Sequence, residues 1–208
     1  MYKRQSLEII RRRVDEVGTR EPTIQKQGER RILIQVPGIG SASELKTLIG
    51  TTAKLGFYKV IRQTSNANEL GNARTQTLPA RDEEGVFYVL DKTAVVTGEE
   101  LVDAQPSFNQ NGQPSVSFRF NPGGARKFGN YTSDNVGSLF AIVLDNEVIS
   151  APQIREAITG GSGQITGNFS VQESSDLSIL LRAGALPAPM RFEEERTIGP
   201  ELGQDSID

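Results

Sequence analysis

The stretch SVSFRFNPGGARKF, residues 115–128, carries the clearest fold signal in the chain. Residues 116–120 alternate between apolar and polar side chains, which is typical of a strand with one buried face. Asn121 and Pro122 then form a common helix start, an N-cap side chain followed by proline in the first turn. A strand that leads directly into a helix predicts a fold in which helices pack on sheets.

The second half of the chain continues this pattern downstream. Residues 139–144 have the length and apolar character of a buried strand. Asp145 and Asn146 tolerate positive φ, so they suit a two-residue hairpin turn. Ser170 and Glu173 match the S-x-x-E capping box, which predicts one further helix. The second half therefore predicts strands interleaved with two helices.

The first half shows a similar alternation of helix and strand. Apolar residues recur with helical spacing over 7–17, and two strand-like runs follow at 23–27 and 31–36 with a glycine turn between them. Another S-x-x-E box predicts a short helix over 41–49, and residues 53–58 alternate as a strand does. The first half thus reads as helix, hairpin, helix and strand.

This element order resembles two successive split β-α-β modules. The predicted fold class is therefore α+β, with two subdomains of the split β-α-β (ferredoxin-like) type, a base and an inserted head. Pro187 and Pro189 prevent the last helix from continuing. We therefore expect a discontinuous base of residues 1–92 and 187–208, and a head of residues 93–186.

Three details of this organisation depend on weaker patterns. The first module lacks an opening strand, so either a strand near Phe192 returns to complete it or residues upstream have been trimmed. Residues 62–85 are polar and follow neither the helical nor the strand period, so we expect a long loop there. The arginines at 11–13 fall on the polar side of the first helix, and we expect them to be solvated and paired with nearby acids.

The composition excludes several classes of function. The 208 residues include no Cys, His or Trp, and 23 Lys+Arg against 26 Asp+Glu give a net charge of −3. Without Cys and His, the chain can form no disulfide and has no thiol or imidazole catalyst. The absence of these ligands also argues against a zinc or copper enzyme. The near-neutral charge, with no basic stripe beside aromatics, argues against a nucleic-acid partner. The longest uncharged apolar stretch, Gly137–Leu144, is too short to cross a bilayer, so we expect a soluble chain.

Two functions that act on small molecules stay open at this level. The glycines and basic residues at 123–127, or the glycines at 160–161, could bind an anion or another small ligand. An enzyme would have to use carboxylate pairs, and the acidic runs at 82–84 and 193–195 are the candidates. Solvated acidic faces and ordinary helix starts explain the same residues without any ligand.

Three stretches, residues 6–40, 142–170 and 180–207, resemble the SecD/SecF family of bacterial protein-export membrane proteins. The last, LLRAGALPAPMRFEEERTIGPELGQDSI, is long and distinctive, and in the family its C-terminal end lies just before the second transmembrane helix. The resemblance implies that the chain is the first periplasmic domain of a SecD-type subunit, between two membrane spans. The family's Asp-(Leu/Phe)-x-Gly-Gly motif after the first span is absent, which fits the missing first strand.

What the resemblance implies is transport without catalysis and without a cofactor. The domain would bind the emerging unfolded preprotein and move to assist proton-gradient-driven translocation across the inner membrane, at its periplasmic face. The implied partners are SecF, the SecYEG translocon, YajC and unfolded preproteins. Transmembrane helices outside this chain would anchor the domain and would also carry the family's proton-relay residues.

A clamp for unfolded chains needs an apolar surface for variable sequences and a hinge between head and base. For the preprotein-binding surface we expect Phe108, Phe118 and Ile154, with core packing as the alternative for Phe118. For the hinge we expect glycines near the crossings between head and base, namely Gly98, Gly160, Gly161 and Gly163. A plain tight turn is the alternative at residues 160–163.

Overall fold

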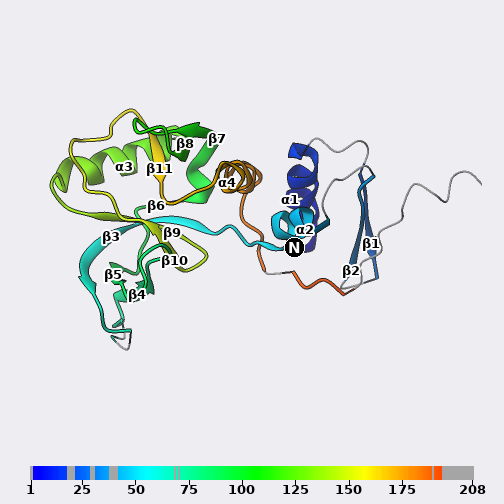
Figure 1. Ribbon diagram of the computed structural model, residues 1–208, viewed down its shortest axis with the longest axis horizontal. Helices are drawn as coiled ribbons and strands as arrows, with labels where there is room; N and C mark the ends of the chain where they lie inside the picture. Colours follow the sequence, from blue (N-terminus) through cyan, green and yellow to red (C-terminus); the bar gives the residue numbers. More distant parts are fainter. Residues whose placement is uncertain are drawn as a thin grey trace, which may run out of the picture.

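The computed structural model describes residues 2–17, 22–28, 31–37, 42–67, 69, 71–188 and 190–193 (Figure 1). It combines helices with antiparallel sheets, so the predicted α+β class is confirmed. Figure 1 shows an N-terminal region of two helices and a hairpin beside a larger region that contains the other strands, with helix α4 between the two. Among the described residues, no helix is both long enough and apolar enough to cross a membrane.

The N-terminal region contains helix α1 (Tyr2–Glu16), strands β1 (Thr23–Gln27) and β2 (Arg31–Gln35), and helix α2 (Ala42–Gly50). The two strands pair antiparallel as the predicted hairpin. Ile10 and Val14 of α1 are buried and form a small core with Ile49 of α2, as the helical spacing predicts. The first residue of the S-x-x-E box predicted to start the second helix, Ser41, lies outside the described residues.

The largest sheet has the strand order β10-β9-β3-β5-β4, with β6 also paired to β3. Its strands are β3 (Leu55–Thr64), β4 (Thr75–Pro79), β5 (Phe87–Asp91), β6 (Val96–Thr97), β9 (Phe140–Leu144) and β10 (Glu147–Ser150). Ala80 bridges to Val148 of β10, and the Arg81 N–H donates to the Val148 carbonyl. The two edges of the sheet therefore meet. Asp145 and Asn146 form the β9–β10 turn with positive φ, as predicted.

The prediction of one long loop over residues 62–85 is wrong. Strand β3 continues to Thr64, and Thr75–Pro79 forms β4, which pairs antiparallel with β5. The side chains of β4 are mostly polar and half-buried, so the strand shows no apolar alternation. It forms because β5 offers a complete row of backbone partners, a tertiary effect that outweighs local propensity.

A second sheet has the order β11-β8-β7. This part of the chain comprises the 3₁₀ turn η1 (Gly98–Glu100), β7 (Leu101–Phe108), β8 (Pro114–Phe120), helix α3 (Pro122–Asp134) and β11 (Ser162–Thr166). Asn121 is the N-cap of α3, as predicted. Sequence reasoning did not identify β7, which contains Pro106; the strand lies at the edge of this sheet, where proline is tolerated.

The two sheets and α3 share an apolar core centred on Phe57 of β3. Its ring lies 5.2–6.4 Å, between centroids, from the rings of Phe118, Phe120, Phe128 and Phe140. Most of these pairs are tilted or edge-on, arrangements that aromatic rings prefer. Because the rings come from β3, β8, α3 and β9, the core binds β3 through β11 into one packed unit.

Helix α4 (Val171–Ala183) connects this unit to the N-terminal region. The predicted capping box of Ser170 and Glu173 is present, and Gly184 ends the helix with φ +89°. Beyond it, the Leu186 N–H donates to the Thr52 carbonyl at 2.8 Å. The chain therefore enters and leaves the larger region at adjacent points.

The strand expected near Phe192 is absent from the described part of the chain, where residues 190–193 belong to no strand. Among the described residues, β1 and β2 pair only with each other, while β3, expected to join them, pairs with β5, β6 and β9. The largest sheet therefore crosses the boundary expected after residue 92. The ferredoxin-like type and the division into 1–92 with 187–208 and 93–186 stay predictions; residues 194–208 lie outside the described residues.

Candidate functional site: an exposed hairpin, a junction and a polar pocket

The hairpin between β7 and β8 presents an aromatic side chain to solvent. Phe108, the last residue of β7, is 62% exposed. The turn that follows is well ordered, because the Asn109 side-chain oxygen accepts hydrogen bonds from the N–H groups of Asn111 and Gln113 at 2.9 and 3.0 Å. Gln164 of β11 donates to the Phe108 carbonyl. The exposed ring therefore stands on a fixed backbone.

The other two residues predicted for the binding surface are buried. Phe118 is 6% exposed and Ile154 is 1% exposed, and both belong to the core around Phe57. Phe118 therefore packs in the core, which was the alternative for this residue, and Ile154 packs in the same core. Of the three, only Phe108 lies on the surface, and its contact with a preprotein stays a prediction.

The four glycines predicted as hinges have different surroundings. Gly98 opens η1, and Gly160 faces open space. Gly161 has φ +67°, and a Cβ there would lie 2.5 Å from a side chain of α3. Gly163 lies within β11, where a Cβ would come within 2.6 Å of the Phe118 ring. Close packing thus explains two of the glycines, and rotation at any of the four stays a prediction.

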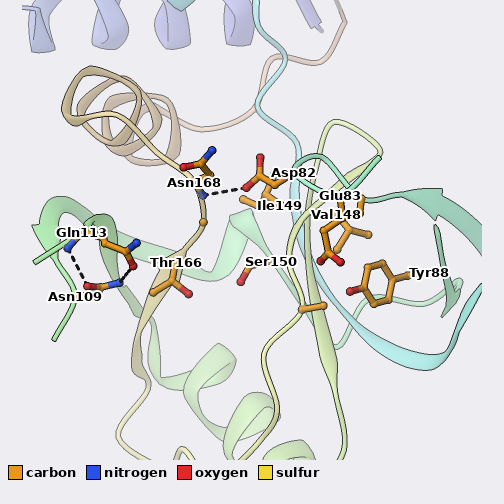
Figure 2. Close-up of a pocket in the computed structure, with 13 residues that line it drawn as sticks. Asp82, Glu83, Tyr88, Asn109, Gln113, Val148, Ile149, Ser150, Thr166 and Asn168 are labelled. Atoms are coloured by element: carbon orange, nitrogen blue, oxygen red, sulfur yellow. Dashed lines mark hydrogen bonds between the residues drawn. The ribbon is translucent and has the colours of Figure 1, made fainter. Parts of the chain in front are cut away.

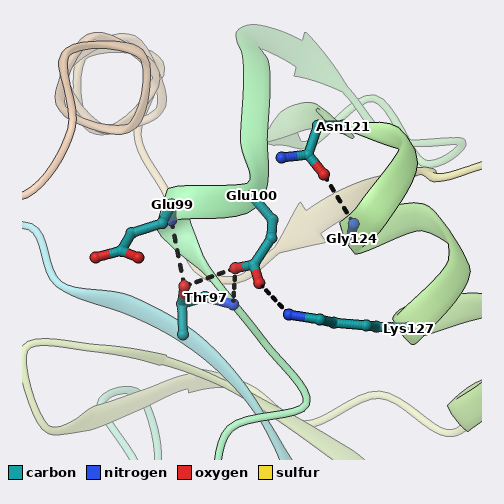
Figure 3. A network of polar contacts seen from close by, with 6 residues as sticks. All are labelled: Thr97, Glu99, Glu100, Asn121, Gly124 and Lys127. Carbon is teal, nitrogen blue, oxygen red and sulfur yellow. Dashed lines mark hydrogen bonds and ion pairs between the residues drawn. The ribbon is translucent and has the colours of Figure 1, made fainter.

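The glycine-rich start of α3, considered above as an anion site, is engaged in contacts within the protein (Figure 3). The Asn121 side chain accepts from the Gly124 N–H, and Lys127 pairs with Glu100 at 2.7 Å. Burial alone would raise the pKa of Glu100, but hydrogen bonds from Lys127 and Thr97 outweigh burial and lower this pKa to about 2. The Glu100 carboxylate thus neutralises Lys127, one of the two basic residues of this candidate anion site.

At the junction between the two regions, Arg13 of α1 is fully buried. Its guanidinium donates to the carbonyls of four residues at the ends of α2 and α4: Leu48 at 2.7 Å, Gly184 at 3.0 Å, Thr51 and Thr52. Carbonyl dipoles at helix C-termini favour a cation there. Burial lowers the pKa of Arg13 to about 10 and the charge of Asp145 partly offsets this, so the side chain stays charged at neutral pH.

Asp145 holds the same junction from the other side. Its carboxylate accepts hydrogen bonds from the Thr52 hydroxyl and from the N–H groups of Ala53 at 3.0 Å and Lys54 at 2.9 Å. The link from α2 to β3 thus has Arg13 on its carbonyls and Asp145 on its N–H groups. Two opposite charges fix the conformation of the link that leads into the larger region.

An open pocket of about 430 Å³ lies among β10, the end of β11 and the β7–β8 turn (Figure 2). Its polar lining consists of Asp82, Glu83, Tyr88, Asn109, Gln113, Ser150, Thr166 and Asn168. The Asp82 carboxylate accepts from the Asn168 N–H at 2.9 Å, which ties the segment after β4 to the segment after β11. Since Asn109 follows Phe108, the pocket adjoins the hairpin that exposes this ring.

The acidic run at 82–84, considered above for catalysis, partly lines this pocket. Burial raises the pKa of the Tyr88 hydroxyl, and the charge of Glu83 raises it further, so Tyr88 is a protonated donor at neutral pH. Within the described residues, no group of three acids is placed to hold a metal ion. Of the second acidic run, only Glu193 is described, and it pairs with Arg31 at the surface.

Two family models together cover most of the chain. Residues 3–62 match the N-terminal part of the P1 domain of protein translocase subunit SecDF, and residues 75–188 match the SecDF P1 head subdomain. The chain belongs to the SecDF family. It is a P1 domain in which the N-terminal subdomain and the head subdomain follow one another, and the resemblance noted in the sequence is confirmed. The family consists of transport components, not enzymes.

Relatives and solved structures agree with this assignment. The P1 domain is 61% identical to protein translocase subunit SecD of Rhodobacter capsulatus and 43% identical to that of Aquifex aeolicus, over 98% and 99% of the chain. It spans only 37% and 41% of the length of these relatives. A structure described as a membrane component SecDF that enhances protein export aligns with a TM-score of 0.72 at 33% identity, over 94% of this chain and 92% of that one. SecDF in its super-membrane-facing form gives 0.75 at 36% identity, over 97% and 29%.

Sequence reasoning missed the two charges of the junction and the tyrosine of the pocket. The prediction that all three arginines at 11–13 are solvated is wrong for Arg13. Its position held a usable signal, because it lies three residues after Ile10 and next to Val14 on the buried side of α1. Tyr88 gave no such signal, since the pocket forms only when distant segments come together.

Proposed function

We propose that this P1 domain binds the emerging unfolded preprotein at the periplasmic face of the inner membrane and moves to assist its proton-gradient-driven translocation. The observation that carries the proposal is the match to protein translocase subunit SecD over 98% of the chain. Phe108 supports it, because an exposed ring on a fixed hairpin suits an apolar contact that many sequences can make.

The partners follow from the same family relationship. SecF, the SecYEG translocon and YajC are the membrane partners, and unfolded preproteins are the substrate. Transmembrane helices outside this chain anchor the domain and couple it to the proton gradient. The structure of one SecDF relative is described as that of a component that enhances protein export, which supports this assignment.

The proposed motion is a rotation of a head, residues 93–186, on a ferredoxin-like base formed by residues 1–92 and 187–208. With a head of these bounds, Gly98, Gly160, Gly161 and Gly163 absorb the rotation, whereas in a moving unit that starts nearer the N-terminus they lie inside the body that moves. The boundary after residue 92 conflicts with the pairing of β3 and β9, so a larger moving unit that starts after the link at residues 52–54 fits the sheet better. In either case α1 stays with the base and α4 moves with the head.

Photocrosslinking tests the binding surface. A photoreactive amino acid at Phe108 of the full-length protein should give adducts with a preprotein stalled during translocation in membrane vesicles. Val136, 54% exposed at the turn after α3, is the matched control position. Equal adduct yields at 108 and 136 would contradict a binding surface at the hairpin.

A covalent link tests the motion. Glu16 of α1 and Arg182 of α4 form an ion pair at 2.7 Å, and the chain has no native Cys. Glu16→Cys with Arg182→Cys, joined by a short bismaleimide, should abolish the stimulation of export. The control pair Glu8→Cys and Arg12→Cys lies within α1 and restrains no movement between helices. Normal export with the first pair fully linked would refute a rotation between α1 and α4.

A further inference from the structure

The charged side chains that line the polar pocket among β10, β11 and the β7–β8 turn are all acidic. Asp82 and Glu83 line it, while no Lys or Arg lines it among the described residues. The basic residue next in sequence, Arg81, contacts Glu173 of α4 at 3.4 Å. Asp82 retains one carboxylate oxygen beyond its contact with the Asn168 N–H. The pocket therefore offers negative charge with no partner cation among the described residues that line it.

Tyr88 gives an independent sign of a ligand. The residue is only 5% exposed, yet it lines the pocket, and the described residues give its hydroxyl no hydrogen-bond partner. Figure 2 shows this hydroxyl turned into the pocket beside the Glu83 carboxylate. The phenol oxygen can therefore accept a hydrogen bond from a donor group of a ligand that enters the pocket.

The remaining lining adds acceptors on several sides. Ser150 and Thr166 face the pocket from β10 and β11 in Figure 2, and each hydroxyl can accept a hydrogen bond. A guanidinium group has five N–H donors and an ammonium group has three, and neither has an acceptor. Two carboxylates with surrounding hydroxyls thus match an organic cation in both charge and hydrogen-bonding sense.

From this geometry we infer that the pocket binds a guanidinium or ammonium group, held by Glu83 and Asp82 and contacted by the Tyr88 hydroxyl. In the protein at work the group is the side chain of an arginine or lysine on an extended polypeptide, an identification that rests on the proposed function. Phe108, on the adjoining hairpin, then contacts an apolar residue of the same polypeptide. The same site would also take a free organic cation.

Calorimetry with matched ligands tests the charge requirement. The 208-residue chain is titrated at low salt with an unstructured peptide that has one central arginine, and with the same peptide carrying neutral citrulline. The arginine peptide should bind about tenfold more tightly, as expected for charge-assisted hydrogen bonds. Free arginine amide forms a second arm: if it binds as well as the peptide, the ligand is the cation alone, and if it does not, the polypeptide is required.

Three variants locate the site. Glu83→Gln and Tyr88→Phe should each weaken the arginine peptide about threefold to tenfold and leave the citrulline peptide unchanged. Glu156→Gln removes an exposed acid that does not line the pocket, and it should have no effect. Thermal unfolding of each variant checks that the fold is intact.

Two results would overturn the inference. Equal affinity for the arginine and citrulline peptides would show that charge plays no part, while preprotein contact at Phe108 could still stand. A loss with Glu156→Gln as large as with Glu83→Gln would show diffuse attraction and no site. Failure of the proposed function is seen separately, as the absence of adducts from Phe108 in the crosslinking experiment.

Discussion

The side chains of Phe57 and Arg13 are both fully buried, but the contacts around them are of different kinds. Phe57 lies among four rings from four elements, and its contacts are apolar and tolerant of small shifts. Arg13 lies among backbone carbonyls at two helix ends, and its contacts are directional. The first arrangement makes one solid unit, and the second joins two units at a defined angle.

This difference indicates where the molecule can rearrange. Moving any strand past Phe57 would expose aromatic area, which costs about 25 cal/mol for each Å². Moving α1 and α2 relative to α4 would break the hydrogen bonds of Arg13, whose carbonyls water can satisfy once the junction opens. It would also separate Leu48 of α2 from Ile179 and Leu180 of α4, an apolar cluster smaller than the one around Phe57. We therefore expect the larger region to move as a body and the junction around Arg13 to be where movement starts.

The largest effect should come from the aromatic core. Phe57→Ala leaves a cavity among four rings and should destabilise the chain by about 3–5 kcal/mol in urea unfolding. Phe108→Ala is the control, and it should change the unfolding free energy by less than about 0.5 kcal/mol because the ring is already exposed. Similar losses for both variants would remove the basis for regarding Phe57 as the centre of the core.

The junction should give a smaller and more local effect. Arg13→Met keeps much of the side-chain volume but leaves the carbonyls of α2 and Gly184 without their donor, and should cost about 2–3 kcal/mol. Hydrogen exchange should show faster opening of α1 and α2 and little change in β3. Arg12→Met removes an exposed charge from the same helix and serves as the control. Uniform loss of protection in both regions would mean that they unfold as one unit.

A third effect, confined to acid, concerns a polar pair inside the larger region. The pKa of Glu100 is lowered from 4.5 to about 2 in the folded chain, so its contribution to stability is full above pH 4.5 and is lost as the pH falls toward 2. Glu100→Gln should therefore flatten the decline in unfolding free energy over that range, measured by urea unfolding at several pH values. Glu99→Gln, at an exposed neighbour, should leave the decline as it is.

The smallest effect should come from the rim of the junction. Glu16 and Arg182 are partly exposed, so their ion pair gains little over solvation by water. A double-mutant cycle of Glu16→Gln and Arg182→Gln should give a coupling energy of about 0.5 kcal/mol. If this coupling energy were as large as the loss of unfolding free energy in Arg13→Met, the exposed ion pair would stabilise the junction as much as the buried arginine does.

The elements that sequence predicted well are those whose signal is local. The alternation over residues 116–120, the N-cap at Asn121 and the capping box at Ser170 each act within one or two turns of chain, and the structure contains them all. Strand β4 and strand β7 were missed, because the first has polar side chains and the second contains Pro106. Both owe their existence to partners elsewhere in the chain.

The candidate sites divide along the same line. Phe108 was predicted as a surface residue and is one, whereas Phe118 and Ile154 are apolar residues whose burial depends on how the sheets pack. The pocket around Tyr88 draws on five separate stretches between Ala80 and Asn168, so no spacing rule in the sequence reveals it. Local chemistry is visible in the sequence, and convergence of distant segments is visible only in the fold.

The hydrogen bond between the Leu186 N–H and the Thr52 carbonyl brings together the two points at which the chain crosses into the larger region. A segment whose ends lie side by side can be exchanged as a cassette, because a replacement needs only to match one short separation. Larger regions of different size or surface can thus be grafted onto the same pair of N-terminal helices. Over evolutionary time, the same arrangement would let the larger region diversify while the N-terminal helices are kept.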